Sequence, residues 1–174
     1  QSGPNLISFP ALPENRSVDN IFSGINEIIS GGSSATFIDG QWTGTLVEVS
    51  QDEGYWVIVY MDMTLDIFEA IPISYDEDGI ITYDIAIGPN LISYPYQIPQ
   101  NVEKALGDVA SNIAAIHGEG ITTVKIDSIW AGSLQSFEGG KGYWVMALND
   151  FSFTFNEPQE DLTRTLSTSY HRSM

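Results

Sequence analysis

The sequence predicts a strand-dominated α+β protein. It is built from two tandem homologous units, each a small antiparallel sheet or partial barrel with one amphipathic helix. Three observations lead to this prediction: an internal duplication, several short apolar runs in each copy, and one stretch per copy with the spacing of a helical face. Hydrophobic residues make up 43% of the 174 residues, which is enough to bury a core.

The opening motif shows the duplication most directly. GPNLISFP at residues 3–10 returns as GPNLISYP at residues 88–95, a shift of 85 residues. Both segments contain a predicted apolar strand, at residues 6–9 and 91–94, that ends at a proline, which cannot donate a ladder hydrogen bond.

Two tryptophan motifs repeat as well. WTGTL at residues 42–46 corresponds to WAGSL at 130–134, and GYWV occurs at 54–57 and again at 142–145, in both cases with a shift of 88 residues. All four tryptophans of the chain therefore occupy matched positions. Chance does not produce such a match, so the repeat is a duplication.

A helix is predicted after the first strand of each copy. Apolar residues at 18–29 and at 102–116 recur at the spacing of one helical face, with Ser17 and Asn101 placed as N-caps. Strands follow at 35–38 and 122–126 and at the GYWV segments. A final period-two alternation is predicted to form one more strand in each copy, through Met63, Leu65 and Ile67 and through Phe151, Phe153 and Phe155.

These patterns divide the chain into repeat unit 1 (residues 1–70), a connecting hairpin (71–87), repeat unit 2 (88–156) and a polar tail (157–174). The hairpin is predicted from a turn-forming Asp78-Gly79 pair between two strand-like runs. No counterpart of the hairpin precedes the first copy, which suggests that these residues come from a longer chain. The two units are expected to pack with pseudo-two-fold or translational similarity.

Composition excludes several classes of function. Six Lys and Arg residues oppose 23 Asp and Glu residues, giving a formal net charge of −17. Such a charge repels nucleic acid and anionic membrane surfaces. The apolar runs are too short to insert in a membrane. The absence of cysteine excludes disulfides, thiol nucleophiles and thiolate metal sites.

An acidic cluster is the best candidate for a metal site. Asp76, Asp78 and Asp84 could supply the carboxylate oxygens that Ca2+ prefers, but their spacing does not match an EF-hand loop. A solvated turn around Asp78-Gly79 explains the same residues. The sequence therefore predicts no cofactor, with these three residues as the candidates if Ca2+ binds.

The repeated aromatic residues have two interpretations. Successive residues of a strand point to opposite faces, so at most one member of each Tyr-Trp pair in the GYWV segments lies in a core. A duplicated exposed aromatic would form a bivalent ligand surface, with Trp42, Tyr55, Trp130 and Tyr143 as the candidate residues. In the competing interpretation, aromatics fill two small cores. The predicted core residues are Leu6, Ile7, Ile21, Phe22, Ile25, Trp56, Leu91, Ile92, Leu106, Val109 and Trp144.

The sequence contains no recognisable set of catalytic residues. The two histidines, His117 and His171, have no counterpart in the other copy, and no nucleophile elbow or P-loop occurs. A chain with 23 acidic residues always contains pairs of carboxylates, so their presence does not indicate a glycoside hydrolase. The sequence predicts a protein that is not an enzyme.

The pattern GxNLIS[FY]P, WxGxL and GYWV resembles a repeat of large secreted and cell-surface bacterial proteins, and similar repeats occur in structural proteins of marine phages. The resemblance covers residues 3–68 and 88–156 and brings no catalytic residues with it. It implies a non-catalytic extracellular, cell-surface or virion module. Two non-catalytic functions stay open, with a hydrolase fragment that uses acidic residues as catalysts as a distant third. One is structural assembly, with protein partners or further copies of the chain; the alternative is a carbohydrate-binding or adhesive module that uses the repeated Trp and Tyr positions on a surface glycan.

Overall fold

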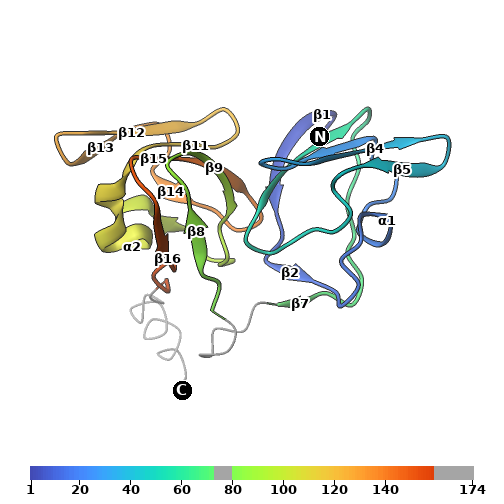
Figure 1. Cartoon of the computed structure of the whole chain (residues 1–174), viewed down its shortest axis with the longest axis horizontal. Coiled ribbons are helices and arrows are strands. Elements are labelled where there is room, and N and C mark those ends of the chain that lie inside the picture. Colours follow the sequence, from blue (N-terminus) through green and yellow to red (C-terminus); the bar gives the residue numbers. More distant parts are fainter. Residues whose placement is uncertain (73–79, 159–174) are drawn as a thin grey trace, which may run out of the picture.

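The computed structural model describes residues 1–72 and 80–158 (Figure 1). Strands dominate, which confirms the predicted strand-dominated α+β class. The helices are short, with α1 at Val18–Ile21, α2 at Val102–Leu106 and one 3-10 helix at Gly107–Asn112.

Each repeat unit holds one five-stranded antiparallel sheet. Across the sheet of unit 1 the order is β1 (Gly3–Ser8), β6 (Gly54–Val59), β3 (Glu27–Ile29), β4 (Ser34–Ile38) and β5 (Gln41–Gly44). Across the sheet of unit 2 it is β9 (Gly88–Ser93), β15 (Gly142–Ala147), β11 (Ile113–His117), β12 (Thr122–Ile126) and β13 (Ile129–Gly132). Every strand has its counterpart at the same place, so the duplication extends to the topology.

Three short strand pairs lie beside these sheets. They are β2 (Ala11–Leu12) with β7 (Ile71–Pro72), β10 (Gln100–Asn101) with β14 (Ser136–Phe137), and β8 (Tyr83–Ile85) with β16 (Phe151–Phe153). The predicted strand at Phe151–Phe155 is therefore present in part. The matching run at 63–67 is not a strand, although its three apolar residues pack against the core of unit 1.

The long helices predicted at 18–29 and 102–116 are wrong. Each is a short helix followed by a strand of the main sheet. The backbone enters the left-handed region at Gly24 (φ +73°) and Gly107 (φ +54°), which interrupts helical geometry. Beyond these glycines, β-branched residues such as Ile28 and Ile113 are fully buried at the centre of the sheets. The apolar spacing in such short runs fits both the 3.6-residue period of a helix and the two-residue period of a strand. Burial in the sheet decides between these two structures.

The connecting hairpin predicted at 71–87 is not formed by the described residues. Residues 73–79, which include the predicted Asp78-Gly79 turn, lie outside them. Of the two flanking strands, β7 pairs with β2 in unit 1, whereas β8 pairs with β16 in unit 2. An isolated two-stranded hairpin gains little stability, whereas β8 buries Tyr83 and Ile85 in the core of unit 2.

Each unit has its own hydrophobic core, with a buried tyrosine at its centre. Tyr55 and Tyr143 are 0% and 1% exposed, and Trp56 and Trp144 on the opposite strand face are half-buried rather than in the predicted core. Ile7 and Val109 are also half-buried. The other predicted core residues are buried as expected: Leu6, Ile21, Phe22, Ile25, Leu91, Ile92 and Leu106.

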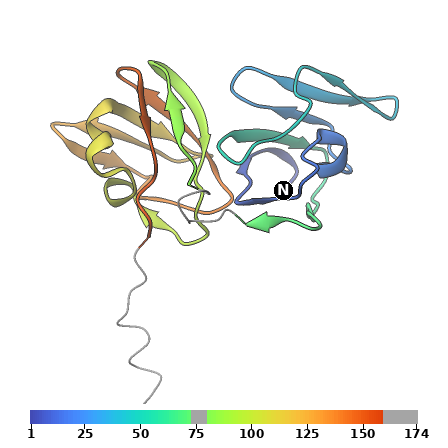
Figure 2. The ribbon, with the colours of Figure 1, turned by 60° about the horizontal axis from the view of Figure 1, so that its bottom comes forward.

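Equivalent segments join the two units (Figure 2). The Ser8 backbone N–H donates to the Gly140 carbonyl (3.0 Å), and the Ser93 N–H donates to the Asp52 carbonyl (3.1 Å). Ser93 is the repeat counterpart of Ser8, and Gly140 is that of Asp52. Each unit therefore presents the same patch to the other, which is the signature of an isologous contact. The units are related by a pseudo-two-fold axis and not by translation.

The serine side chains extend this contact. Ser8 Oγ donates to the Lys141 carbonyl (2.8 Å) and Ser93 Oγ donates to the Gln51 carbonyl (2.6 Å). Both serines are almost fully buried. The serine of the repeated opening motif therefore satisfies carbonyl groups of the opposite unit, as buried polar groups require.

Two glycines lie where the units approach most closely. A Cβ atom on Gly142 would lie 2.9 Å from the Ile7 carbonyl oxygen and 3.2 Å from Gly54 Cα. A Cβ atom on Gly54 would lie 3.0 Å from the Ile92 carbonyl oxygen. The glycine of each GYWV motif is thus required by the contact between units, because backbone atoms occupy the space of any side chain.

We predict that Gly142→Ala lowers the free energy of unfolding by about 1–3 kcal/mol, the usual cost of overpacking a tight interior. Urea unfolding measures this change. Gly32→Ala is the matched control, because its added methyl group meets open space, and it should change stability by less than about 0.5 kcal/mol. Equal stability of the two variants would show that the units are not held in this contact.

Candidate interaction surface

Two equivalent hairpins extend from the sheets. Hairpin 1 (β4–β5, residues 34–44) and hairpin 2 (β12–β13, residues 122–132) lie at opposite ends of the long axis of the molecule (Figure 1). Each has a two-residue turn in which both residues have positive φ: Asp39 and Gly40 in hairpin 1, and Asp127 and Ser128 in hairpin 2. This is the turn geometry whose twist matches that of the flanking strands.

The WxGxL motif builds the base of each hairpin. The backbone at Gly44 has φ +149°, and a Cβ atom there would lie 2.1 Å from the Ser34 carbonyl oxygen. Gly132 repeats this arrangement against Thr122, at 2.2 Å. The chain then bends inward, so that the leucine of each motif is buried, Leu46 in one core and Leu134 in the other. The repeated glycine and leucine are structural residues.

The hairpins expose apolar side chains at matched positions. Ile38 and Ile126, which are repeat counterparts, are 54% and 56% exposed, and Ile129 beside the second turn is 70% exposed. The outermost strands β5 and β13 also have no strand paired to their outer edges within the described residues. Unpaired edges with apolar side chains readily pair with another chain. This surface was not predicted from the sequence, although the Asp39-Gly40 pair, between the apolar run 35–38 and Trp42, favours a hairpin turn.

The structure corrects half of the predicted ligand surface. Tyr55 and Tyr143 lie in the cores and cannot contact a ligand. Their hydroxyl oxygens accept equivalent backbone hydrogen bonds, from Ser50 N–H (2.7 Å) and from Glu138 N–H (2.8 Å). Both tyrosines therefore support the turn that precedes their own strand.

Trp42 and Trp130 are half-buried on the hairpins. Trp42 packs against Phe22 and Phe37, with ring centroids 6.3 and 5.3 Å away. Trp130 lies under the Lys125 ammonium group at 5.4 Å, and its indole N–H is buried without a hydrogen-bond partner in the described part of the chain. Both rings connect a hairpin to its core, so they are anchors more than free stacking surfaces.

Of the three acidic residues predicted as metal candidates, only Asp84 lies within the described residues. Asp84 accepts a hydrogen bond from Ser152 Oγ (2.6 Å), whereas Asp76 and Asp78 lie outside the described residues. Among residues 1–72 and 80–158, no group of three or more His, Asp or Glu side chains is placed to hold a metal ion. His117 Nδ1 lies 2.7 Å from Thr122 Oγ1.

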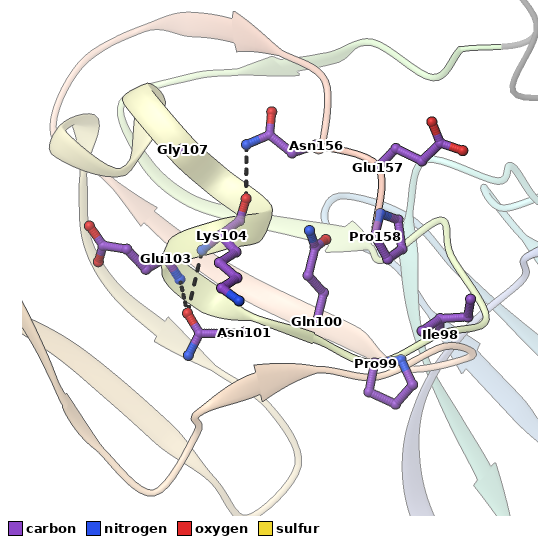
Figure 3. A pocket seen from close by; sticks show the side chains of 10 residues that line it. All are labelled: Ile98, Pro99, Gln100, Asn101, Glu103, Lys104, Gly107, Asn156, Glu157 and Pro158. Atoms are coloured by element: carbon purple, nitrogen blue, oxygen red, sulfur yellow. Dashed lines mark hydrogen bonds between the residues drawn. The ribbon is translucent and has the colours of Figure 1, made fainter. Parts of the chain in front are cut away.

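A hollow of about 620 Å3 lies beside α2 (Figure 3). Its asparagines are engaged by the backbone of this helix: Asn101 accepts from the Glu103 N–H (3.0 Å), which bears out the predicted cap, and Asn156 Nδ2 donates to the Lys104 carbonyl (2.8 Å). The rest of the wall combines apolar residues such as Ile98 and Pro158 with the polar side chains of Gln100, Glu103, Lys104 and Glu157. The two asparagines of the hollow serve the fold, because they hold the backbone of α2.

Comparisons with protein-family models, curated proteins and solved structures find no match to this chain. The resemblance to repeats of secreted bacterial and phage structural proteins therefore stays a prediction. Among the described residues, no helix has the length and apolar character needed to cross a membrane.

We predict that Tyr143→Phe lowers the free energy of unfolding by about 1–3 kcal/mol, because the Glu138 N–H loses its buried acceptor. Tyr55→Phe should have a similar effect through Ser50. Tyr60→Phe is the control, since Tyr60 is exposed. Chemical denaturation compares the three variants, and equal stability of all three would contradict the role assigned to the hydroxyl groups.

The buried tyrosines also predict a loss of stability in alkali. Burial raises the pKa of Tyr143 to about 12 and raises the pKa of Tyr55 further. An unfolded tyrosine ionises near pH 10, so above this pH the unfolded state binds fewer protons and stability falls as the pH rises towards 12. Tyrosinate absorbance should show a late-ionising phase that loses amplitude in Tyr143→Phe. An unchanged late phase in this variant would contradict the assignment.

Proposed function

We propose that this protein is a non-catalytic structural module that assembles through its two hairpins on an extracellular, cell-surface or virion structure. The observation that carries the proposal is the pair of equivalent hairpins at opposite ends of one pseudo-two-fold body. Each hairpin offers an edge strand, β5 or β13, whose outer edge is paired with no other strand of the described residues, and an exposed isoleucine.

This arrangement makes the module bivalent. A hairpin edge can add a strand to the sheet of a neighbouring molecule, and backbone hydrogen bonds then supply much of the affinity. Two such edges per molecule let contacts continue from one copy to the next, and repeated contacts of this kind produce chains or layers.

The net negative charge of the chain opposes this association. At a net charge of −17, copies of the chain repel one another in dilute buffer. Salt screens this repulsion over a length of about 8 Å at physiological ionic strength. Assembly through apolar edges is therefore expected to strengthen with salt.

The carbohydrate-binding alternative ranks second. Two of its four candidate residues, Tyr55 and Tyr143, are in the cores, and the other two anchor the hairpins. Duplicated half-buried tryptophans are the observation that still supports it, since an indole face that is partly exposed can stack on a sugar ring.

We predict that the chain self-associates in physiological salt and that the double variant Ile38→Glu/Ile126→Glu weakens this association at least about tenfold, because it places a charge on each apolar tip. Sedimentation over a range of protein and salt concentrations measures it. Unfolding should be unchanged, since both side chains are exposed.

Val47→Glu is the matched control, because Val47 is also well exposed, at 68%, but lies outside the hairpins. This control should associate like the unsubstituted protein. A chain that stays monomeric at high concentration and high salt would overturn self-assembly. Saturable glycan binding that is lost in Trp42→Ala/Trp130→Ala, with folding retained, would favour the second candidate instead.

A further inference from the structure

Hairpin 2 presents an apolar surface on its outer side. Directly opposite residues of paired strands share a face of the sheet, so the pairs Val124–Ala131 and Ile126–Ile129 lie on the same side of this hairpin. Thr123, the neighbour of Val124 in β12, is fully buried and points to the opposite face. The two pairs therefore face away from the core of unit 2.

The apolar surface continues onto the neighbouring strands of the sheet. Ala115 of β11 is paired with Val124 on one side and with Met146 of β15 on the other, so all three share a face. Ala115 is buried and Met146 is half-buried, whereas the four residues of the hairpin are exposed. We call these six residues the apolar face: Ala115, Val124, Ile126, Ile129, Ala131 and Met146.

The duplication supplies an internal comparison for the apolar face. The strands are paired in the same way at the matching positions of unit 1. Four of the six counterparts there are polar: Glu27, Thr36, Gln41 and Thr43. The same sheet therefore forms with polar residues at these places, and the fold does not require the apolar ones. A contiguous exposed apolar patch of this kind marks an interaction site.

The charge distribution indicates which surface fits the apolar face. None of its six side chains is ionisable, although the chain has a formal net charge of −17. Lys125 lies on the other side of the hairpin, over the ring of Trp130. A basic partner would be attracted to the acidic remainder of the molecule and not to this neutral patch. A second copy of the apolar face is also neutral, so two copies meet here without burying a charge.

We propose that the apolar face binds the same face of a second copy of the chain, so that the two sheets stack in a closed two-fold dimer. Stacked sheets lie about 10 Å apart and bury the side chains between them. An isologous contact uses the same patch on both molecules and ends at two copies. The inference rests on the proposed self-assembly and names its first step. Hairpin 1 stays outside the dimer and keeps its edge strand β5 for contacts between dimers.

An exchange of residues between the two units tests the apolar face. In the variant Val124→Thr/Ile129→Gln/Ala131→Thr, unit 2 receives residues that the matching sheet of unit 1 already accommodates. Sedimentation in physiological salt should show dimerisation weakened at least about tenfold, because the contact loses apolar area. The matched control is Gln41→Glu, which places a charge at the counterpart of Ile129 and should dimerise like the unsubstituted protein. Urea unfolding checks that both variants fold.

Methyl NMR identifies the occupant of the apolar face. In a sample that mixes methyl-labelled and unlabelled chains, the methyl groups of Val124, Ile126 and Ile129 should show contacts across the interface to residues of the same face. In dilute, monomeric protein these methyl groups should be accessible to a soluble paramagnetic probe. They should become protected from the probe as the dimer forms.

Four results would overturn the proposal. They are the absence of a dimer, dimerisation that is unchanged in the folded triple variant, methyl contacts from the apolar face to a different surface of the second copy, and protection of these methyl groups in the monomer. The last result would show that another segment of the chain covers the face.

The variant Ile38→Glu separates this inference from the proposed edge assembly, because Ile38 lies on hairpin 1 and outside the apolar face. It should dimerise normally while assembly beyond the dimer is weakened. Dimers that never assemble further would contradict the edge assembly alone. Larger assemblies that form equally well in the triple variant would contradict the dimer alone.

Discussion

The structure depends on the isologous contact between the two repeat units. Ser8 and Ser93 each donate a backbone and a side-chain hydrogen bond to a turn of the opposite unit, and Gly54 and Gly142 let the two backbones approach. Burial raises the pKa of the Asp52 carboxyl in one of these turns. Because the contact uses the same residues from both sides, one duplicated sequence is sufficient to build both halves of it.

Each motif that is alike in the two copies has a structural role. The opening motif supplies the buried serine, GYWV supplies the close glycine and the core tyrosine, and WxGxL supplies the bend and the buried leucine of each hairpin. Each of these positions has one physical requirement that few residue types meet. At the hairpin tips, where the turn sets only the backbone, Gly40 in one unit is matched by Ser128 in the other.

The symmetry of the molecule determines where the proposed interaction surfaces lie. A pseudo-two-fold body presents each surface twice, in opposite directions. The hairpins therefore occur twice and lie at opposite ends of the long axis, which suits a bivalent module.

The sequence by itself determined the duplication, the strand-dominated class and most of the core, because matched motifs and period-two burial are local properties of the chain. Residues 27–29 and Ile113 were misassigned to helices because their short apolar runs fit two periods, and only the sheet decides between them. Likewise, Tyr55 rather than Trp56 faces the core because the register of β6 sets which strand face is covered. The pseudo-two-fold contact and the separate partners of β7 and β8 are long-range pairings. Such pairings depend on which surfaces meet in three dimensions, and tertiary structure alone decided them.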